Sequence, residues 1–211
     1  MSEEELNAVA NVLELKGTLG ELFSMKVYRR NLILLMVLWS FSSFAFFLVP
    51  FYIGNNDLNI YLISLCLGLG EVISTLICMF VTHGRDTRKS LIVFCAVSCV
   101  GSLGALVFSS VYKGSSQVPE AATYLVLYVG VVTCFDLVYL IVVDLFPTIF
   151  LATAYGACNV VGRFVSILAP LMAGVPAPWP MLNLTAFSAI CIALPFCLVK
   201  VDHQQKGKAP N

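Results

Sequence analysis

Three charged residues interrupt otherwise apolar stretches of the sequence: Glu71, Asp136 and Arg163. A charge at the centre of a bilayer costs about 3 kcal/mol or more, so such a side chain normally faces protein or water and has a partner. The rise of about 1.5 Å per helical residue places all three near the midplane of a membrane. They therefore predict a cavity for a small charged molecule, a structural pair within the protein, or polar contacts with another subunit.

Six apolar stretches are long enough to carry these charges across a membrane, because a hydrocarbon core of about 30 Å takes about 20 helical residues to cross. The composition agrees: 59% of the 211 residues are apolar and 11% are charged, whereas soluble proteins carry about 25% charged residues. The stretches are 31–53, 58–81, 90–112, 121–143, 150–174 and 180–199. We therefore predict an all-α integral membrane protein with a six-helix transmembrane bundle over residues 31–199.

The basic residues outside these stretches predict how the bundle is oriented. Ten of them lie on the side of the two termini, whereas the opposite loops carry only Lys113. The positive-inside rule then places both termini in the cytoplasm or a matrix, and both the plasma membrane and the mitochondrial inner membrane agree with that. Residues 1–30 are predicted to form an amphipathic surface helix and lead-in, and residues 200–211 a polar tail.

The residue patterns of enzymes and of cofactor-binding proteins are not found in the sequence. Both histidines, His83 and His203, lie outside the six stretches, and no nucleophile–base spacing or phosphate-binding loop occurs. The eight cysteines lie inside the apolar stretches without a CxxC pair, which favours packing over zinc binding or disulfides. We expect no catalysis, no cofactor, no metal and no nucleic-acid partner.

A turn motif, Asp144-Leu-Phe-Pro-Thr148, joins the fourth and fifth stretches. Pro147 cannot donate a backbone hydrogen bond, and Asp144 and Thr148 are expected to cap the amides of the next helix. With Gly162-Arg-Phe-Val-Ser-Ile-Leu-Ala-Pro170, Leu19-Gly-Glu-Leu-Phe23 and Gly70-Glu-Val72, this motif resembles the organic cation, organic anion and carnitine transporter family of the major facilitator superfamily. The resemblance covers roughly residues 18–200 and implies the C-terminal half of such a transporter.

The resemblance also implies roles for individual residues. The position of Glu71 is acidic in the family's cation carriers, that of Arg163 is basic in its anion carriers, and carnitine-type carriers combine both. Trp39 and Phe46 match aromatic positions that line the family's cavity and would face a quaternary ammonium, with plain packing as the alternative. The sequence departs from the family at Leu151, where the family has an arginine.

Small residues and the missing arginine carry two further expectations. Ala152, Gly156 and Ala157 predict a close approach of the fifth span to a neighbour.

Major facilitator carriers bind substrate between two six-helix halves, so the charged face of one half has to be covered by a second copy, a separate N-terminal half or other membrane subunits. Because Leu151 replaces the arginine and the N-terminal half is absent, the sequence favours a transporter-derived accessory subunit of a larger membrane complex.

The alternative is a half-transporter for small organic ions, acting as a dimer or with a separate N-terminal half. Carnitine-like zwitterions would be its first candidate substrates, followed by organic cations or anions. Both hypotheses place the chain in a lipid bilayer.

Overall fold

The computed structural model describes residues 17–54, 59–82, 86–111 and 117–199, in which no strand occurs. Six helical spans in these ranges are long and apolar enough to cross a membrane. The helices are α2 (Leu19–Ser24), α3 (Lys26–Gly54), α4 (Ile60–Thr82), α5 (Thr87–Val111), α6 (Gln117–Leu145), α7 (Thr148–Ser166), α8 (Leu168–Ala173), α9 (Trp179–Ala193) and the 3-10 helix η1 (Leu194–Cys197). The predicted all-α, six-helix membrane fold is confirmed, whereas residues 1–16 of the predicted surface helix and the tail 200–211 lie outside the described residues.

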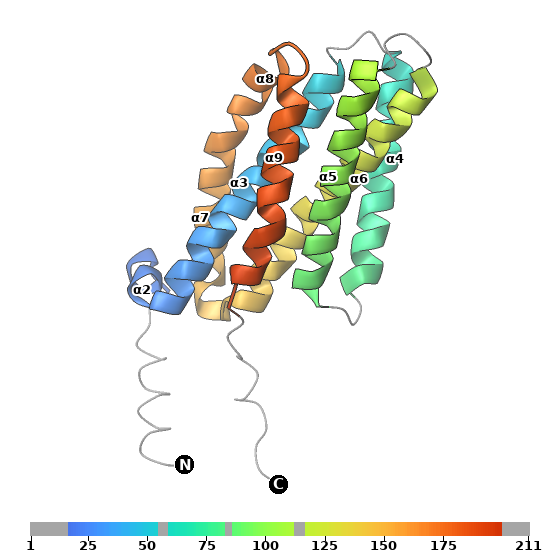
Figure 1. The fold of residues 1–211 in the computed structure, drawn as a ribbon. Helices are drawn as coiled ribbons and strands as arrows, with labels where there is room; N and C mark the ends of the chain where they lie inside the picture. Colours follow the sequence, from blue (N-terminus) through green and yellow to red (C-terminus); the bar gives the residue numbers. More distant parts are fainter. Residues whose placement is uncertain (1–16, 55–58, 83–85, 112–116, 200–211) are drawn as a thin grey trace, which may run out of the picture.

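In chain order the long helices fall into two groups of three, and the extensive helix contacts run between the two groups and not within them. The first group is α3, α4 and α5, and the second is α6, α7 with α8, and α9. In space, α4, α5 and α6 lie together on one side of the bundle, and α3, α7 and α8 lie on the other (Figure 1). The first helix of each group packs against the second helix of the other, α3 against α7 and α6 against α4. Such reciprocal packing is expected of the internal repeats found in each half of major facilitator transporters. It leaves α3 and α6 as the most buried of the spans.

Glycines allow α5 and α6 to lie in direct contact. A Cβ atom on Gly101 would lie 2.6 Å from Leu127 Cα, and one on Gly130 would lie 2.7 Å from the backbone nitrogen of Ser98. Both distances are shorter than a carbon side chain tolerates, so only glycine permits this approach of the two backbones. Packing of this kind is a main source of helix association in lipid, where burial of apolar surface between helices gains little.

The predicted fifth span, 150–174, crosses the membrane as two helices rather than one. α7 ends at Ser166 and α8 begins at Leu168. Pro170 lacks the N–H that would bond to the carbonyl of Ser166 four residues earlier, which interrupts the helix at this point. The Ser166 hydroxyl donates a hydrogen bond to the Gly162 carbonyl oxygen at 2.8 Å.

The two ends of the described chain lie together at one end of the bundle. The buried side chain of Asn31, near the start of α3, donates to the Val199 carbonyl oxygen at 2.8 Å and accepts from the Val199 N–H at 3.0 Å. Arg88, at the start of α5, donates to the Leu198 carbonyl oxygen at 2.7 Å. Arg30 on α3 also donates to the Cys197 carbonyl oxygen at 2.5 Å. These side-chain hydrogen bonds hold the segment after α9 against α3 and α5. The assignment of this end to the cytoplasmic side stays a prediction.

The turn between α6 and α7 corrects the prediction that Asp144 and Thr148 cap the next helix. Pro147 is the N-cap of α7, and no side-chain hydrogen bond caps that end. Asp144 Oδ2 instead accepts a hydrogen bond from Thr87 Oγ1 at 2.7 Å. The prediction was wrong because α6 continues to Leu145, which keeps Asp144 within α6 and turns its carboxylate toward the start of α5.

Candidate functional site

A strip of aromatic side chains connects α3 and α6 along the bundle. The ring centroids of Trp39 and Tyr139 are 4.1 Å apart, those of Tyr139 and Phe135 are 5.1 Å apart, and Phe135 stacks on Phe46 at 5.1 Å. Tyr128 extends the strip, with its ring 6.2 Å from that of Phe46. Trp39 and Tyr128 are buried, whereas the other three rings are half-buried. We call these five residues the aromatic strip.

An acidic edge borders the strip on α4 and α6. The Tyr128 hydroxyl donates a hydrogen bond to Glu71 Oε1 at 2.9 Å, and the Glu71 side chain is otherwise exposed. The preceding residue, Gly70, leaves room for this contact, because a Cβ atom there would lie 2.9 Å from Tyr128 Cδ1. Asp136 is half-buried on α6 and close enough to Glu71 for their charges to interact. Two carboxylates in this arrangement repel each other, so a cation beside them would be favourable.

Arg163 on α7 lies beside α3, on the side of the strip away from α4. Its guanidinium carbon is 5.9 Å from the centroid of the Phe47 ring, within the range of a cation–π contact. The side chain is exposed, and among the described residues it has no ion pair or side-chain hydrogen bond. A structural pair between Arg163 and either Glu71 or Asp136 is therefore not formed in this part of the chain. The guanidinium remains available to a carboxylate.

Gly162, and not the small residues named from the sequence, lets α7 approach α3. A Cβ atom on Gly162 would lie 2.6 Å from Trp39 Cδ1, whereas one on Gly156 would meet nothing within 4 Å. Ala152 and Gly156 are exposed, and the buried side of α7 carries Ala154 and Cys158. Ala157, the third residue named from the sequence, is half-buried and packs against the core as expected. The expectation was wrong at Ala152 and Gly156, because the closest contact follows the face of α7 that carries Gly162.

The structure brings most of the predicted site residues to one face of the bundle. Trp39 and Phe46 belong to the aromatic strip, Glu71 and Asp136 form its acidic edge, and Arg163 lies at its other border. The turn residues Asp144, Pro147 and Thr148 do not, because the end of α6 lies at the end of the bundle where the described termini meet. What the five gathered residues bind stays a prediction.

Sequence reasoning missed three members of the strip, Tyr128, Phe135 and Tyr139. Their spacing along α6, seven residues and then four, places all three side chains on one face of a helix. That signal is present in the sequence but weak, because apolar residues occupy every face of a buried membrane helix. Contact with Phe46 and Trp39 of α3 is what distinguishes this face.

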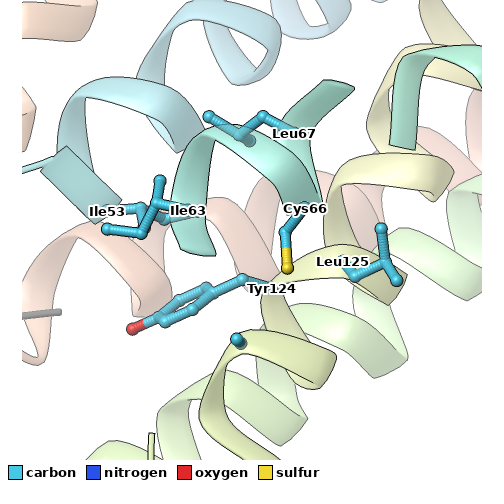
Figure 2. A pocket seen from close by; sticks show the side chains of 7 residues that line it. Ile53, Ile63, Cys66, Leu67, Tyr124 and Leu125 are labelled. Carbon is cyan, nitrogen blue, oxygen red and sulfur yellow. The ribbon is translucent and has the colours of Figure 1, made fainter. Parts of the chain in front are cut away.

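A small apolar crevice lies where the end of α3 meets α4 and α6. Figure 2 shows Ile53, Ile63, Cys66 and Tyr124 among the side chains around it. Its volume of about 10 Å³ is at the lower limit for a single water molecule. We assign no ligand to this crevice.

No protein family model matches the chain. Among curated proteins it is similar to solute carrier family 22 member 7 of Rattus norvegicus, with 25% identity over 100% of the chain and 39% of that protein. Solute carrier family 22 member 7 of Bos taurus is 28% identical over 100% of the chain and 38% of its own length, and member 6 of Mus musculus is 24% identical over 82% and 31%. The chain thus spans less than two fifths of each of these relatives. With its six membrane helices, it resembles the organic-ion transporters of solute carrier family 22, a major facilitator family, over the length of one half.

Proposed function

We propose that the chain is one half of a carrier for small organic ions and binds its substrate along the aromatic strip, between the acidic edge and Arg163. The observation that carries this proposal is the separation of two acids from an arginine that forms no ion pair with any described residue, all on the same aromatic face. The similarity to solute carriers supports transport as the class of function. It gives no support to the accessory subunit that the sequence favoured, so the half-transporter alternative is now preferred.

The chemistry of the face favours a zwitterion of carnitine type. An ammonium group would lie near Glu71 and Asp136, with the half-buried rings of Phe46 and Phe135 offering cation–π contacts. A carboxylate would bind the guanidinium of Arg163, which can form two parallel hydrogen bonds to it. Pure cations and pure anions would each engage one border of the strip.

Transport requires a second set of six helices opposite this face, because substrate in major facilitator carriers lies between two halves that rock against each other. A second copy, another chain or a further part of a longer protein would supply it. In a pair of identical copies, Glu71 of one copy has to face Arg163 of the other, since like charges across the two-fold axis repel. The same pairing of Glu71 with Arg163 between the two copies would cover the aromatic strip when no substrate is bound.

Uptake by liposomes tests the proposal. Purified chain is reconstituted alone and together with each membrane protein that co-purifies with it in mild detergent, and labelled carnitine, a quaternary ammonium ion and an aromatic carboxylate are offered. We expect uptake of at least one probe above empty liposomes, and we expect Arg163→Ala to abolish carnitine uptake. Arg29→Ala is the matched control, because Arg29 is exposed at the start of α3, away from the strip.

The native mass of the solubilised protein is measured on the same sample. A dimer that takes up substrate identifies the second half as another copy. If the chain is recovered only within a larger complex, and that complex moves none of the three probes, the proposal is wrong and the accessory-subunit hypothesis returns.

A further inference from the structure

A groove with a volume of about 740 Å³ runs between α3, α7, α8 and α9. Phenylalanines form one wall, with the Phe187 ring of α9 at 6.0 Å from Phe41 and 6.4 Å from Phe44 of α3. None of the described side chains that line it is charged. The volume falls within the range of about 300–1,000 Å³ that is typical of small-molecule sites.

The groove exists because α9 does not close against α3 as α5 closes against α6. Between α5 and α6, Gly101 and Gly130 bring the two backbones into contact. Where α9 faces α3, bulky rings take the place of glycine, and α9 packs mainly against α5 instead (Figure 1). The space beside the rings is left unfilled by the described residues.

The groove lies on the other side of α7 from Arg163. Gly162 marks the line along which α7 meets Trp39 of α3. Successive residues of an α-helix are rotated by about 100°, so Val161 and Arg163 lie on opposite sides of that line. Val161 lines the groove, and it is exposed, as are Val37 and Ile190 on the other two helices. The groove therefore opens toward lipid and is separate from the aromatic strip.

Two polar atoms are buried at this groove without a hydrogen-bond partner among the described residues, Asn183 Oδ1 and Ser40 Oγ. Buried polar atoms are rarely left unpaired, and each exception needs an explanation. A serine hydroxyl in a helix can turn to the carbonyl four residues earlier, which gives Ser40 a local partner. The Asn183 amide is the better marker of a ligand. A hydroxyl group both donates and accepts, so it satisfies this amide in either orientation.

The position of Asn183 along α9 indicates how such a ligand would lie. Asn183 is four residues after Trp179, which is about 6 Å of helix. Trp179 is exposed at the first residue of α9, and tryptophan is enriched at the interface between membrane and water. The amide is thus near the headgroup level, while Phe187 and Phe41 lie deeper. The wall of the groove therefore suits a ligand with a polar group near the headgroups and an apolar part deeper in the membrane.

We propose that the groove is a binding site for a sterol-type lipid, whose hydroxyl bonds to Asn183 and whose rings pack against Phe41, Phe44 and Phe187. The absence of charge from the lining residues excludes an organic ion or an ionised headgroup inside the groove. An acyl chain would fill part of the space but leave Asn183 Oδ1 without a hydrogen bond. The site does not depend on the proposed transport function.

Photolabelling with a diazirine-bearing sterol tests the site in the full chain reconstituted in vesicles. We expect the labelled peptides to come from α3 and α9 at the groove. Excess cholesterol should reduce labelling at least fivefold, whereas cholestane, which lacks the hydroxyl, should not. Labels that map elsewhere, or equal competition by cholestane and cholesterol, overturn the proposal; the second result means that the groove holds hydrocarbon of any kind.

Two variants sharpen the test. Asn183→Leu should reduce labelling about fivefold, and Val37→Trp, which adds a ring at the groove, should reduce it as well. Their controls are Asn159→Leu, an amide of α7 that does not line the groove, and Val107→Trp, an exposed position on α5. Unchanged labelling in Asn183→Leu contradicts the assigned hydroxyl contact. If that variant fails to fold, the competition between cholesterol and cholestane on the unmodified chain still decides.

Discussion

The α4–α6 contact and the α7–α3 contact are built alike and carry opposite charges. In each, a mid-helix glycine receives an aromatic ring from the first helix of the other group, Gly70 with Tyr128 and Gly162 with Trp39. The residue after the glycine is charged in both, Glu71 in one and Arg163 in the other. The difference lies in what holds the charge. Glu71 accepts a hydrogen bond from the hydroxyl of the tyrosine that packs on Gly70, whereas Arg163, among the residues that the structure describes, contacts only the face of Phe47.

This difference implies that the acidic side and the basic side of the proposed site have different roles in binding. The acid is held in place before any substrate arrives, and part of its hydrogen-bonding capacity is already used. The arginine donates no hydrogen bond to the described residues, so all its N–H groups can bind an incoming group. We therefore expect the basic side to dominate substrate affinity and the acidic side to tune selectivity.

Neutralising Arg163 and Glu71 in turn should have the largest effect, and the effect should be on substrate uptake. Losing one partner of a buried charge pair costs about 2–5 kcal/mol, so Arg163→Gln should lower carnitine uptake about 100-fold, given tenfold per 1.4 kcal/mol. Glu71→Gln should lower uptake of a quaternary ammonium about tenfold, because Asp136 remains nearby. Initial uptake rates in liposomes measure both. Equal losses for both probes in both variants would mean that the two sides do not discriminate charge.

Adding one methyl group to Gly162 should produce the next largest effect. The new Cβ atom would lie 2.6 Å from Trp39, which is buried and held between Tyr139 and Tyr155. Overpacking of this kind costs about 1–3 kcal/mol, so Gly162→Ala should lower the midpoint of thermal unfolding in detergent. Gly156→Ala is the control on the same helix, where the Cβ atom meets nothing within 4 Å and alanine favours the helix. Similar behaviour of the two variants would contradict the contact.

Gly70→Ala should destabilise the acidic side by less than Gly162→Ala destabilises the basic side. Its Cβ atom would lie 2.9 Å from Tyr128, a slightly longer approach to a ring with fewer aromatic neighbours. We expect a loss of about 1–2 kcal/mol. The double variant Gly70→Ala, Tyr128→Leu should recover part of it, since the clashing ring is gone. A loss that is fully additive in the double variant would place the cost elsewhere.

Removing the Tyr128 hydroxyl should have the smallest effect on stability. Tyr128→Phe keeps the ring and deletes the hydrogen bond to Glu71, which is worth about 1 kcal/mol. Tyr139→Phe is the matched control, because its hydroxyl has no hydrogen bond within the described part of the chain. Unfolding midpoints of the two variants are compared in the same detergent. An equal shift in both would show that the Glu71 contact does not stabilise the protein.

Much of the fold could be predicted because it follows from local composition. Each apolar stretch has to satisfy its own backbone in lipid, and only a helix does so within a single stretch. The predicted all-α class and six spans follow from that requirement, and so does the membrane location. Interruptions depend on local chemistry as well, yet the break at Ile167 was missed, since a proline in a membrane helix is often tolerated.

Six membrane helices, three intramembrane charges and a resemblance to organic-ion carriers can be recognised in the amino-acid sequence alone. Three features depend on the folded structure: Arg163 has no ion pair among the described residues, Tyr128 donates to Glu71, and Gly162 rather than Gly156 meets α3. These outcomes depend on which faces of different helices meet. Helix contacts in a membrane are selected by shape and by scattered polar contacts, not by hydrophobicity. When nearly every side chain is apolar, the pattern along the chain carries little information about which face is which.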